Sequence, residues 1–248
     1  MNNFDSTTFG ELYAQDYDAL HNPGTTNAAV DFLWWLAANR KTLELAIGSG
    51  RVALPLSKLG LDIQGIDASP EMLALLHAKK GGPSIPVRVG DMADVKMDGT
   101  FGLVFLIFNT LFNLPSQEAQ CRCFENAARH LDPGGCFLIE TFVPDPTQFN
   151  GRQNLKTLRV DAKSVLIEAT IHNPLEQTID YQRILFSDKG MQLNPLPMRY
   201  AWPAEIDLMA KLAGLQLKER WGGWDRSPFT ADSKTHISLY ENQHPGLS

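Results

Sequence analysis

Short apolar runs alternate with helical segments over residues 42–142, and this alternation limits the chain to few folds. The predicted strands cover residues 42–47, 62–67, 85–89, 101–108 and 135–142, and the predicted helices cover 25–38, 50–59, 70–79 and 116–130. Strands and helices in alternation build a parallel sheet with helices packed on both faces. We therefore predict a doubly wound α/β fold.

Three junctions in this region carry capping or turn signals. The Ser-Pro-Glu segment at 69–71 is typical of a helix start, with a capping hydroxyl, a proline in the first position and an acid in the first turn. Ser116 can cap a further helix in the same way. The Asp-Pro-Gly-Gly segment at 132–135 predicts a turn just before the fifth strand.

The pattern changes after Pro144, because residues 150–200 contain β-type runs and no convincing helix. Two runs, Val165–Ile171 and Thr178–Phe186, are predicted strands, and the segment 172–174 (His-Asn-Pro) predicts the turn between them. This segment is inserted after the fifth strand. It could serve as a lid over the site or as a dimerisation sheet.

Alternation resumes after the insertion, with a helix over Pro203–Ala213 and strands near 215–221 and 236–241. We interpret residues 1–248 as a single domain, whose core covers 25–142 and 203–241 and whose β-rich insertion covers 150–200.

Composition narrows the class of partner. The net charge is −6 and no Lys/Arg cluster occurs, which argues against nucleic acid. No apolar stretch approaches the roughly 20 residues that span a bilayer, and the amino-terminal segment lacks the features of a secretion signal. The three cysteines have no metal-site or disulfide spacing. We therefore expect a cytoplasmic protein that needs no metal and acts on a small molecule.

The segment Leu43–Ala53 places Gly48 and Gly50 where the first strand gives way to a helix. Glycine at such a turn lets the backbone approach a ligand closely. The pattern also fits a dinucleotide fingerprint, because Asp67 lies 19 residues (67 − 48) after the first glycine. The loop taken alone therefore leaves an NAD(P) site open.

Acidic residues at the ends of three strands favour SAM over NAD(P) as the cofactor. Glu44, just before the loop, would repel a pyrophosphate but favours the sulfonium and ammonium groups of S-adenosylmethionine (SAM). Asp67 can accept from ribose hydroxyls, and Asp91 can accept from an adenine amino group. Each of the latter two also suits a cap or a turn, but their joint order and spacing favour SAM.

These motifs together resemble the Rossmann-like (class I) SAM-dependent methyltransferase family, in its small-molecule branch. The resemblance is carried by the loop 44–50, by 65–67 (Gly-Ile-Asp), by 90–92 (Gly-Asp-Met) and by 131–135 (Leu-Asp-Pro-Gly-Gly). It implies a mostly parallel seven-stranded sheet whose last strand runs antiparallel beside the fifth, with SAM at the carboxyl ends of the strands. Ala46 departs from the family pattern, which usually has a glycine there.

The resemblance also supplies candidate site residues. Met72 and Met92 would flank the adenine, Asn109 would face the methionine end, and Tyr17 would close over SAM. The predicted cofactor-binding residues are thus Tyr17, Glu44, Ala46, Gly48, Gly50, Asp67, Ala68, Met72, Asp91, Met92 and Asn109. The insertion follows the fifth strand and could therefore cover the carboxyl-end crevice, which makes Tyr181, Arg183 and Tyr200 candidate acceptor contacts, together with Tyr13. The candidate catalytic residues are Asn109 and, in the insertion, His172.

Methyl transfer from a sulfonium requires alignment and exclusion of water, and a base is needed mainly for a hydroxyl acceptor. The sequence therefore predicts an enzyme that transfers a methyl group from SAM to nitrogen or oxygen of a small molecule. The alternatives are an NAD(P)-dependent oxidoreductase that uses the same loop and a SAM-binding protein without catalysis.

Overall fold

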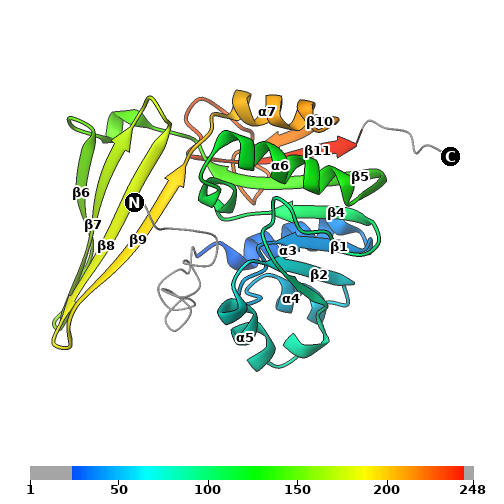
Figure 1. Ribbon diagram of the computed structural model, residues 1–248, viewed down its shortest axis with the longest axis horizontal. Helices are drawn as coiled ribbons and strands as arrows, with labels where there is room; N and C mark the ends of the chain where they lie inside the picture. Colours follow the sequence, from blue (N-terminus) through cyan, green and yellow to red (C-terminus); the bar gives the residue numbers. More distant parts are fainter. Residues whose placement is uncertain (1–23, 243–248) are drawn as a thin grey trace.

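The computed structural model describes residues 24–242 of the 248-residue chain, which form a central seven-stranded sheet and a separate four-stranded sheet (Figure 1). The central strands are β1 (Thr42–Leu45), β2 (Ile63–Asp67), β3 (Val87–Val89), β4 (Phe101–Leu106), β5 (Leu131–Phe142), β10 (Leu215–Trp221) and β11 (Thr235–Asn242). Their order is β10-β11-β5-β4-β1-β2-β3. Strand β11 pairs antiparallel with both β5 and β10, and the other neighbouring pairs are parallel. The predicted topology is confirmed.

Helices cover both faces of the central sheet. The hydrophobic core on one face of the sheet is formed with α3 (Thr26–Ala37), α4 (Ala53–Lys58) and α5 (Pro70–Ala78). The core on the other face is formed with α6 (Gln117–Arg129) and α7 (Pro203–Leu212). Short 3-10 turns lie at η1 (Gly82–Ser84), η2 (Thr110–Asn113) and η3 (Pro146–Gln148). Every residue of β1 and β4 is buried, as expected of strands covered on both sides. None of the helices within 24–242 has the length and apolar character to cross a bilayer.

The predicted helix caps are present, but one helix and one strand begin at residues other than those predicted. Ser69 and Ser116 each accept a backbone N–H through the side-chain oxygen, at 3.1 and 3.2 Å. The first helix after the glycine loop begins at Ala53, because Gly50 has φ +75° and cannot belong to a right-handed helix. The predicted turn at 132–135 lies inside β5 as an irregularity, since the pairing with β4 resumes three residues late after Leu131.

The insertion is an antiparallel meander of β6 (Gln153–Val160), β7 (Ser164–Asn173), β8 (Thr178–Ser187) and β9 (Gly190–Arg199). The sequence indicated only β7 and β8. The turn also starts later than predicted, at Pro174, because proline cannot continue the hydrogen-bonded ladder. His172 belongs to β7, opposite Ile179.

A buried polar network fastens the insertion to the core. The guanidinium of Arg199, at the end of β9, donates to Gln120 of α6 at 2.6 Å and to Glu205 of α7 at 2.7 Å. Gln177 donates to the second carboxylate oxygen of Glu205 at 2.7 Å, and the Gln120 amide donates to the Arg199 carbonyl at 2.8 Å. Charge-assisted hydrogen bonds between largely buried side chains therefore attach the end of β9 to helices α6 and α7.

Candidate functional site

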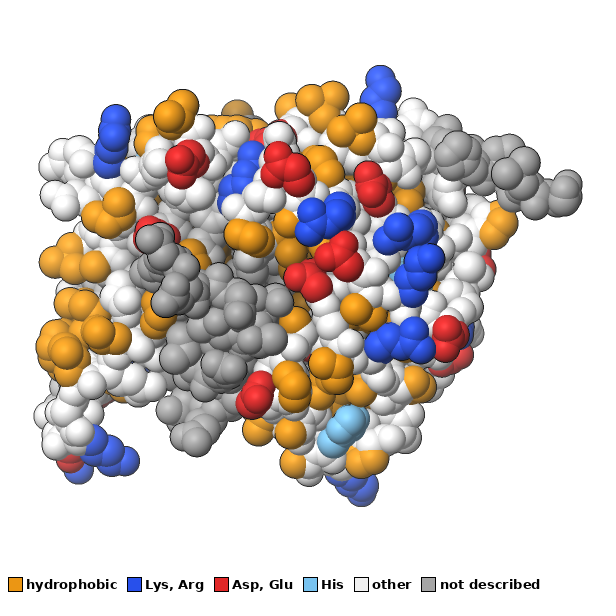
Figure 2. Space-filling view, viewed as in Figure 1, with side chains coloured by type: hydrophobic (Ala, Val, Ile, Leu, Met, Phe, Trp, Pro, Cys, Tyr) orange, Lys and Arg blue, Asp and Glu red, His pale blue; other side chains and the backbone are white. Residues whose placement is uncertain are grey.

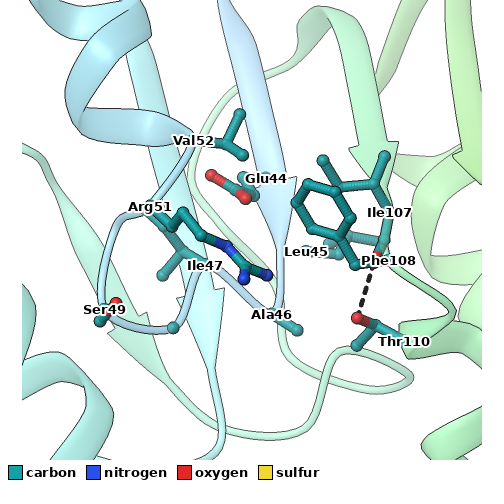
Figure 3. Close-up of a pocket in the computed structure, with 11 residues that line it drawn as sticks. Glu44, Leu45, Ala46, Ile47, Ser49, Arg51, Val52, Ile107, Phe108 and Thr110 are labelled. Atoms are coloured by element: carbon teal, nitrogen blue, oxygen red, sulfur yellow. Dashed lines mark hydrogen bonds between the residues drawn. The ribbon is translucent and has the colours of Figure 1, made fainter. Parts of the chain in front are cut away.

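A pocket opens at the carboxyl ends of β1 and β4 (Figure 3). Its walls come from the end of β1, the glycine loop and the segment after β4. The lining residues are Glu44, Leu45, Ala46, Ile47, Gly48, Ser49, Arg51, Val52, Ile107, Phe108 and Thr110. This is the crevice where ligands bind in open α/β sheets.

The glycine loop is shaped by left-handed backbone and close packing. Gly48 and Gly50 have φ +57° and +75°, where side chains cost energy. A Cβ on Gly50 would lie 2.3 Å from Cδ1 of Leu76. Ala46 also adopts a left-handed φ of +56°, so this chain bears strain where the resembling family has glycine.

Glu44 presents an unsatisfied acceptor to the pocket. Only 5% of the residue is exposed, and its Oε2 atom has no hydrogen-bond partner within residues 24–242. Burial raises the pKa of Glu44 well above its ordinary value, while the charge of Arg51 lowers it. A buried carboxylate oxygen without a partner is suited to receive a cationic or hydrogen-bond-donating ligand.

Asp67 ties the end of β2 to the glycine loop. Its Oδ2 accepts from the Gly48 amide at 2.7 Å, and its Oδ1 accepts from the Ser69 amide at 2.9 Å. Burial raises the pKa of Asp67, and the two amide donors oppose that shift. Each oxygen retains a second lone-pair site, so the predicted contact with ribose hydroxyls is compatible with this geometry and stays a prediction.

The other adenine-side candidates lie near the same edge of the sheet. Asp91 follows β3, and its Oδ1 accepts from the Ala93 amide at 2.8 Å. Met92 is buried in the core, while Met72 lies beside the loop, its Cε 3.3 Å from where a Cβ on Gly48 would stand. The adenine roles of these side chains, and the cofactor role of Ala68, stay predictions.

The segment after β4 is bound to β5. Phe108 and Asn109 have φ +58° and +63°, both left-handed. The Phe108 amide donates to Oε2 of Glu140 at 2.5 Å, and the Phe142 amide donates to Oδ1 of Asn109 at 2.6 Å. The amide oxygen of Asn109 therefore already has a backbone partner, and its predicted catalytic role is untested.

Sequence reasoning missed three residues here. Arg51 and Phe108 line the pocket, with the guanidinium carbon 4.4 Å from the ring centroid (Figure 3). Glu140 lies behind Phe108, and burial raises its pKa to about 7, with Arg51 opposing the shift. An acid at the end of an apolar strand identified Glu44, and the same signal could have identified Glu140.

The structure brings two of the predicted insertion residues together. The imidazole Nε2 of His172 lies 3.0 Å from the hydroxyl of Tyr200, and the Phe149 ring stacks on the imidazole. His172 was expected to be a turn residue, but it is 5% exposed because β7 faces it inward, and burial lowers its pKa. It is therefore a partnered histidine rather than a solvated one.

Tyr181 and Arg183 lie on the same face of the inserted sheet as His172. Burial raises the pKa of Tyr181 to about 12, and Arg183 donates to Glu168 at 2.9 Å. None of these insertion residues is among the described residues that line the pocket. Their acceptor roles stay predictions, and the candidates Tyr13 and Tyr17 lie outside the described residues.

The family model, the related sequence and the related structure that match this chain are all methyltransferases. Residues 42–135 match the model of a methyltransferase domain. Over 96% of this chain and 99% of the relative, the sequence is 26% identical to a cypemycin N-terminal methyltransferase from Streptomyces sp. The CcbJ methyltransferase from Streptomyces caelestis is 36% identical, with a TM-score of 0.91 over 97% of this chain and 100% of that one.

A more distant structure has the same fold. A SAM-bound amino pentose methyltransferase from Micromonospora echinaspora superposes with a TM-score of 0.70, at 17% identity, over 93% of this chain and 96% of that one.

Proposed function

The chain belongs to the class I family of SAM-dependent methyltransferases, and from that premise we propose that it methylates an amine nitrogen of a small molecule. SAM is the methyl donor, which sets aside the NAD(P) alternative, and the protein is an enzyme rather than a non-catalytic binder. We expect it to act in the cytoplasm.

The observation that carries the choice of nitrogen is the position of the predicted base. His172 is hydrogen-bonded to Tyr200 and is not among the described residues that line the pocket. A hydroxyl acceptor benefits from a base at the reacting oxygen, whereas a neutral amine attacks with its own lone pair. The cypemycin and amino pentose relatives are named for action at a peptide amino terminus and on an amino sugar, which supports the same choice.

Bound SAM supplies a methyl group already activated on a sulfonium. The chain's own residues would then hold and align the reactants. The Glu44 oxygen that lacks a partner within residues 24–242 fits a positively charged group. Asp67 offers acceptor sites at the end of β2, and the glycine loop allows close backbone approach. Phe108 lines the pocket, and its apolar ring would exclude water from the reacting groups.

The test compares an amino sugar with the parent sugar that carries a hydroxyl in place of the amine. A second pair is a peptide with a free amino terminus and the same peptide with that amine blocked by acetylation. Transfer of isotope-labelled methyl from SAM is followed by mass spectrometry. We expect transfer to amines alone, with a rate that rises with pH as the amine loses its proton. Transfer to the hydroxyl compounds alone would contradict the proposal.

The inserted sheet supports a further proposal, that a second copy of the chain covers its outer face. Cross-strand pairing places a set of exposed apolar side chains on that face (Figure 2). They are Leu155, Val160, Ile171, Phe186, Met191 and Leu193. Four strands of this length present roughly 600 Å² per side, close to what a standard dimer buries.

Sedimentation velocity of the full chain tests this assembly. We expect a dimer, and a monomer for the variant Leu155→Glu with Leu193→Glu. A wild-type monomer at high protein concentration would refute the dimer without bearing on the methylation of amines.

A further inference from the structure

Two consecutive residues after β4 are held in a backbone conformation that neither prefers. Phe108 and Asn109 both lie in the left-handed region, which is unusual for a bulky aromatic residue. Such strain persists only where the surrounding structure enforces it, and it is concentrated at functional sites. The residues that enforce it are therefore of interest for the reaction.

Three hydrogen bonds join this segment to the end of β5. The carboxylate of Glu140 accepts from the Phe108 amide at 2.5 Å. The Glu140 carbonyl accepts from the Asn109 amide at 3.2 Å, and Asn109 accepts from the Phe142 amide at 2.6 Å. Glu140 thus supplies an acceptor to each of the two strained residues, one from its side chain and one from its backbone.

The strained segment in turn shapes the cofactor pocket. The Phe108 ring forms one wall, and the guanidinium of Arg51 lies over it. Glu140 is 8% exposed and is not among the described lining residues. We propose that Glu140 is a positioning residue, which fixes Phe108 as a wall of the SAM pocket by binding its backbone amide.

The chemistry of the pair suits this role. An amide that donates to a carboxylate makes a charge-assisted bond, which is about twice as strong as one between neutral groups. The field of Arg51 reaches Glu140 and favours the ionised form against the effect of burial. Glu140 can position Phe108 in this way without contacting the cofactor.

The test measures binding of SAM and of S-adenosylhomocysteine by calorimetry at pH 8. We expect Glu140→Leu to weaken both by about tenfold, because the amide loses its acceptor. Glu140→Gln keeps an acceptor and should stay within about threefold of wild type. Thr141→Val is the matched control: it removes a buried bond to His236 from the adjacent residue of β5 and should leave the affinities unchanged.

A double-mutant cycle distinguishes positioning from general damage. If Glu140 acts through Phe108, Glu140→Leu should add little to the loss caused by Phe108→Ala. Additive losses would overturn the proposal, as would an unchanged affinity for Glu140→Leu. A loss as large in Glu140→Gln would also overturn it, because glutamine keeps an acceptor for the Phe108 amide. If Glu140→Leu does not fold, Glu140→Asp, which withdraws the carboxylate by one methylene, takes its place.

Discussion

The central sheet and the inserted sheet differ in how they treat charge. Strands β1 and β5 carry acids at their carboxyl ends, and burial there raises the pKa values of Glu44 and Glu140. In the insertion, the buried carboxylate of Glu168 is instead paired with Arg183 at 2.9 Å. Within the described residues, a carboxylate oxygen of Glu44 has no hydrogen-bond partner at the pocket, whereas Glu168 is paired with a cation on the neighbouring strand. The first arrangement leaves an acceptor for a ligand, and the second satisfies the buried acid within its own sheet.

The largest effect is expected from a substitution that breaks the hydrogen-bond network between the inserted sheet and the core. Arg199→Met leaves Glu205 largely buried without its cation, and we expect it to lower the free energy of unfolding by about 3 kcal/mol. Chemical denaturation measures the loss, and hydrogen exchange should place it in residues 153–199.

Arg159→Met is the control for that change. It removes an exposed ion pair with Asp161 in the same inserted sheet, so we expect a change below about 0.5 kcal/mol. If Arg199→Met weakened SAM binding as strongly as it weakens folding, the separation of the two sheets by role would be wrong.

A second prediction uses the raised pKa of Glu140, from 4.5 to about 7 in the folded protein. The folded state binds this proton more tightly, so the contribution of Glu140 to stability is most favourable below pH 4.5 and falls as pH rises to about 7. The difference of about 2.5 units corresponds to about 3 kcal/mol. Relative to Glu140→Gln, the wild type should lose that amount between these pH values in urea denaturation.

An acid of the insertion should behave in the opposite way. Hydrogen bonds from Ser164 and Lys163 lower the pKa of the exposed Asp161, so its contribution is lost as pH falls. Asp161→Asn should therefore reverse the sign of the pH dependence seen for Glu140→Gln. The same sign in both would show that burial does not distinguish the acids of the two sheets.

A third prediction concerns the glycine loop. Gly50→Val places a side chain against Leu76 and Leu54 at a left-handed φ, and overpacking of this kind costs about 2 kcal/mol. Because the loop must shift to relieve these contacts, we also expect SAM affinity to fall in calorimetry. Gly60→Val has a similar φ of +88° with no atom within 4 Å of its Cβ, so it should destabilise the fold slightly and leave SAM affinity unchanged.

The smallest effect expected is that of Asp67. Replacement by Ala removes acceptors for the Gly48 amide and for the predicted ribose contacts, and we expect SAM binding to weaken by about 1–2 kcal/mol. Arg183→Met, in the insertion, should leave SAM affinity as it is. Equal losses of SAM affinity in both variants would show that the inserted sheet contributes to cofactor binding as much as Asp67 does.

The sequence predicted the central sheet well because both faces of its strands are buried. Continuous apolar runs such as Phe101–Leu106 then mark each strand, and serine caps mark the helices. Strand β6 was not predicted because its residues are largely exposed. Strand β9 was not predicted because it is an edge strand that contains prolines at 195 and 197.

Site residues were predicted where a local signal exists. The glycine loop and its flanking Glu44 carry one, as does Asp67 at a strand end. The burial of His172 depends on Tyr200 and Phe149, which approach it only in the folded insertion. The link between Glu140 and Phe108 joins residues 32 apart, and no sequence spacing announces it.

The carboxylate oxygen of Glu44 that has no partner within residues 24–242 has a consequence for the heat of cofactor binding. Burial raises the pKa of Glu44 in the free protein, and a cation placed beside it lowers that pKa. Binding of a sulfonium cofactor should therefore be coupled to release of protons in the pH range between the two pKa values, and binding of the neutral thioether product should release fewer. The enthalpy measured for SAM should vary with the ionisation heat of the buffer, and its affinity should rise with pH more steeply than that of the product.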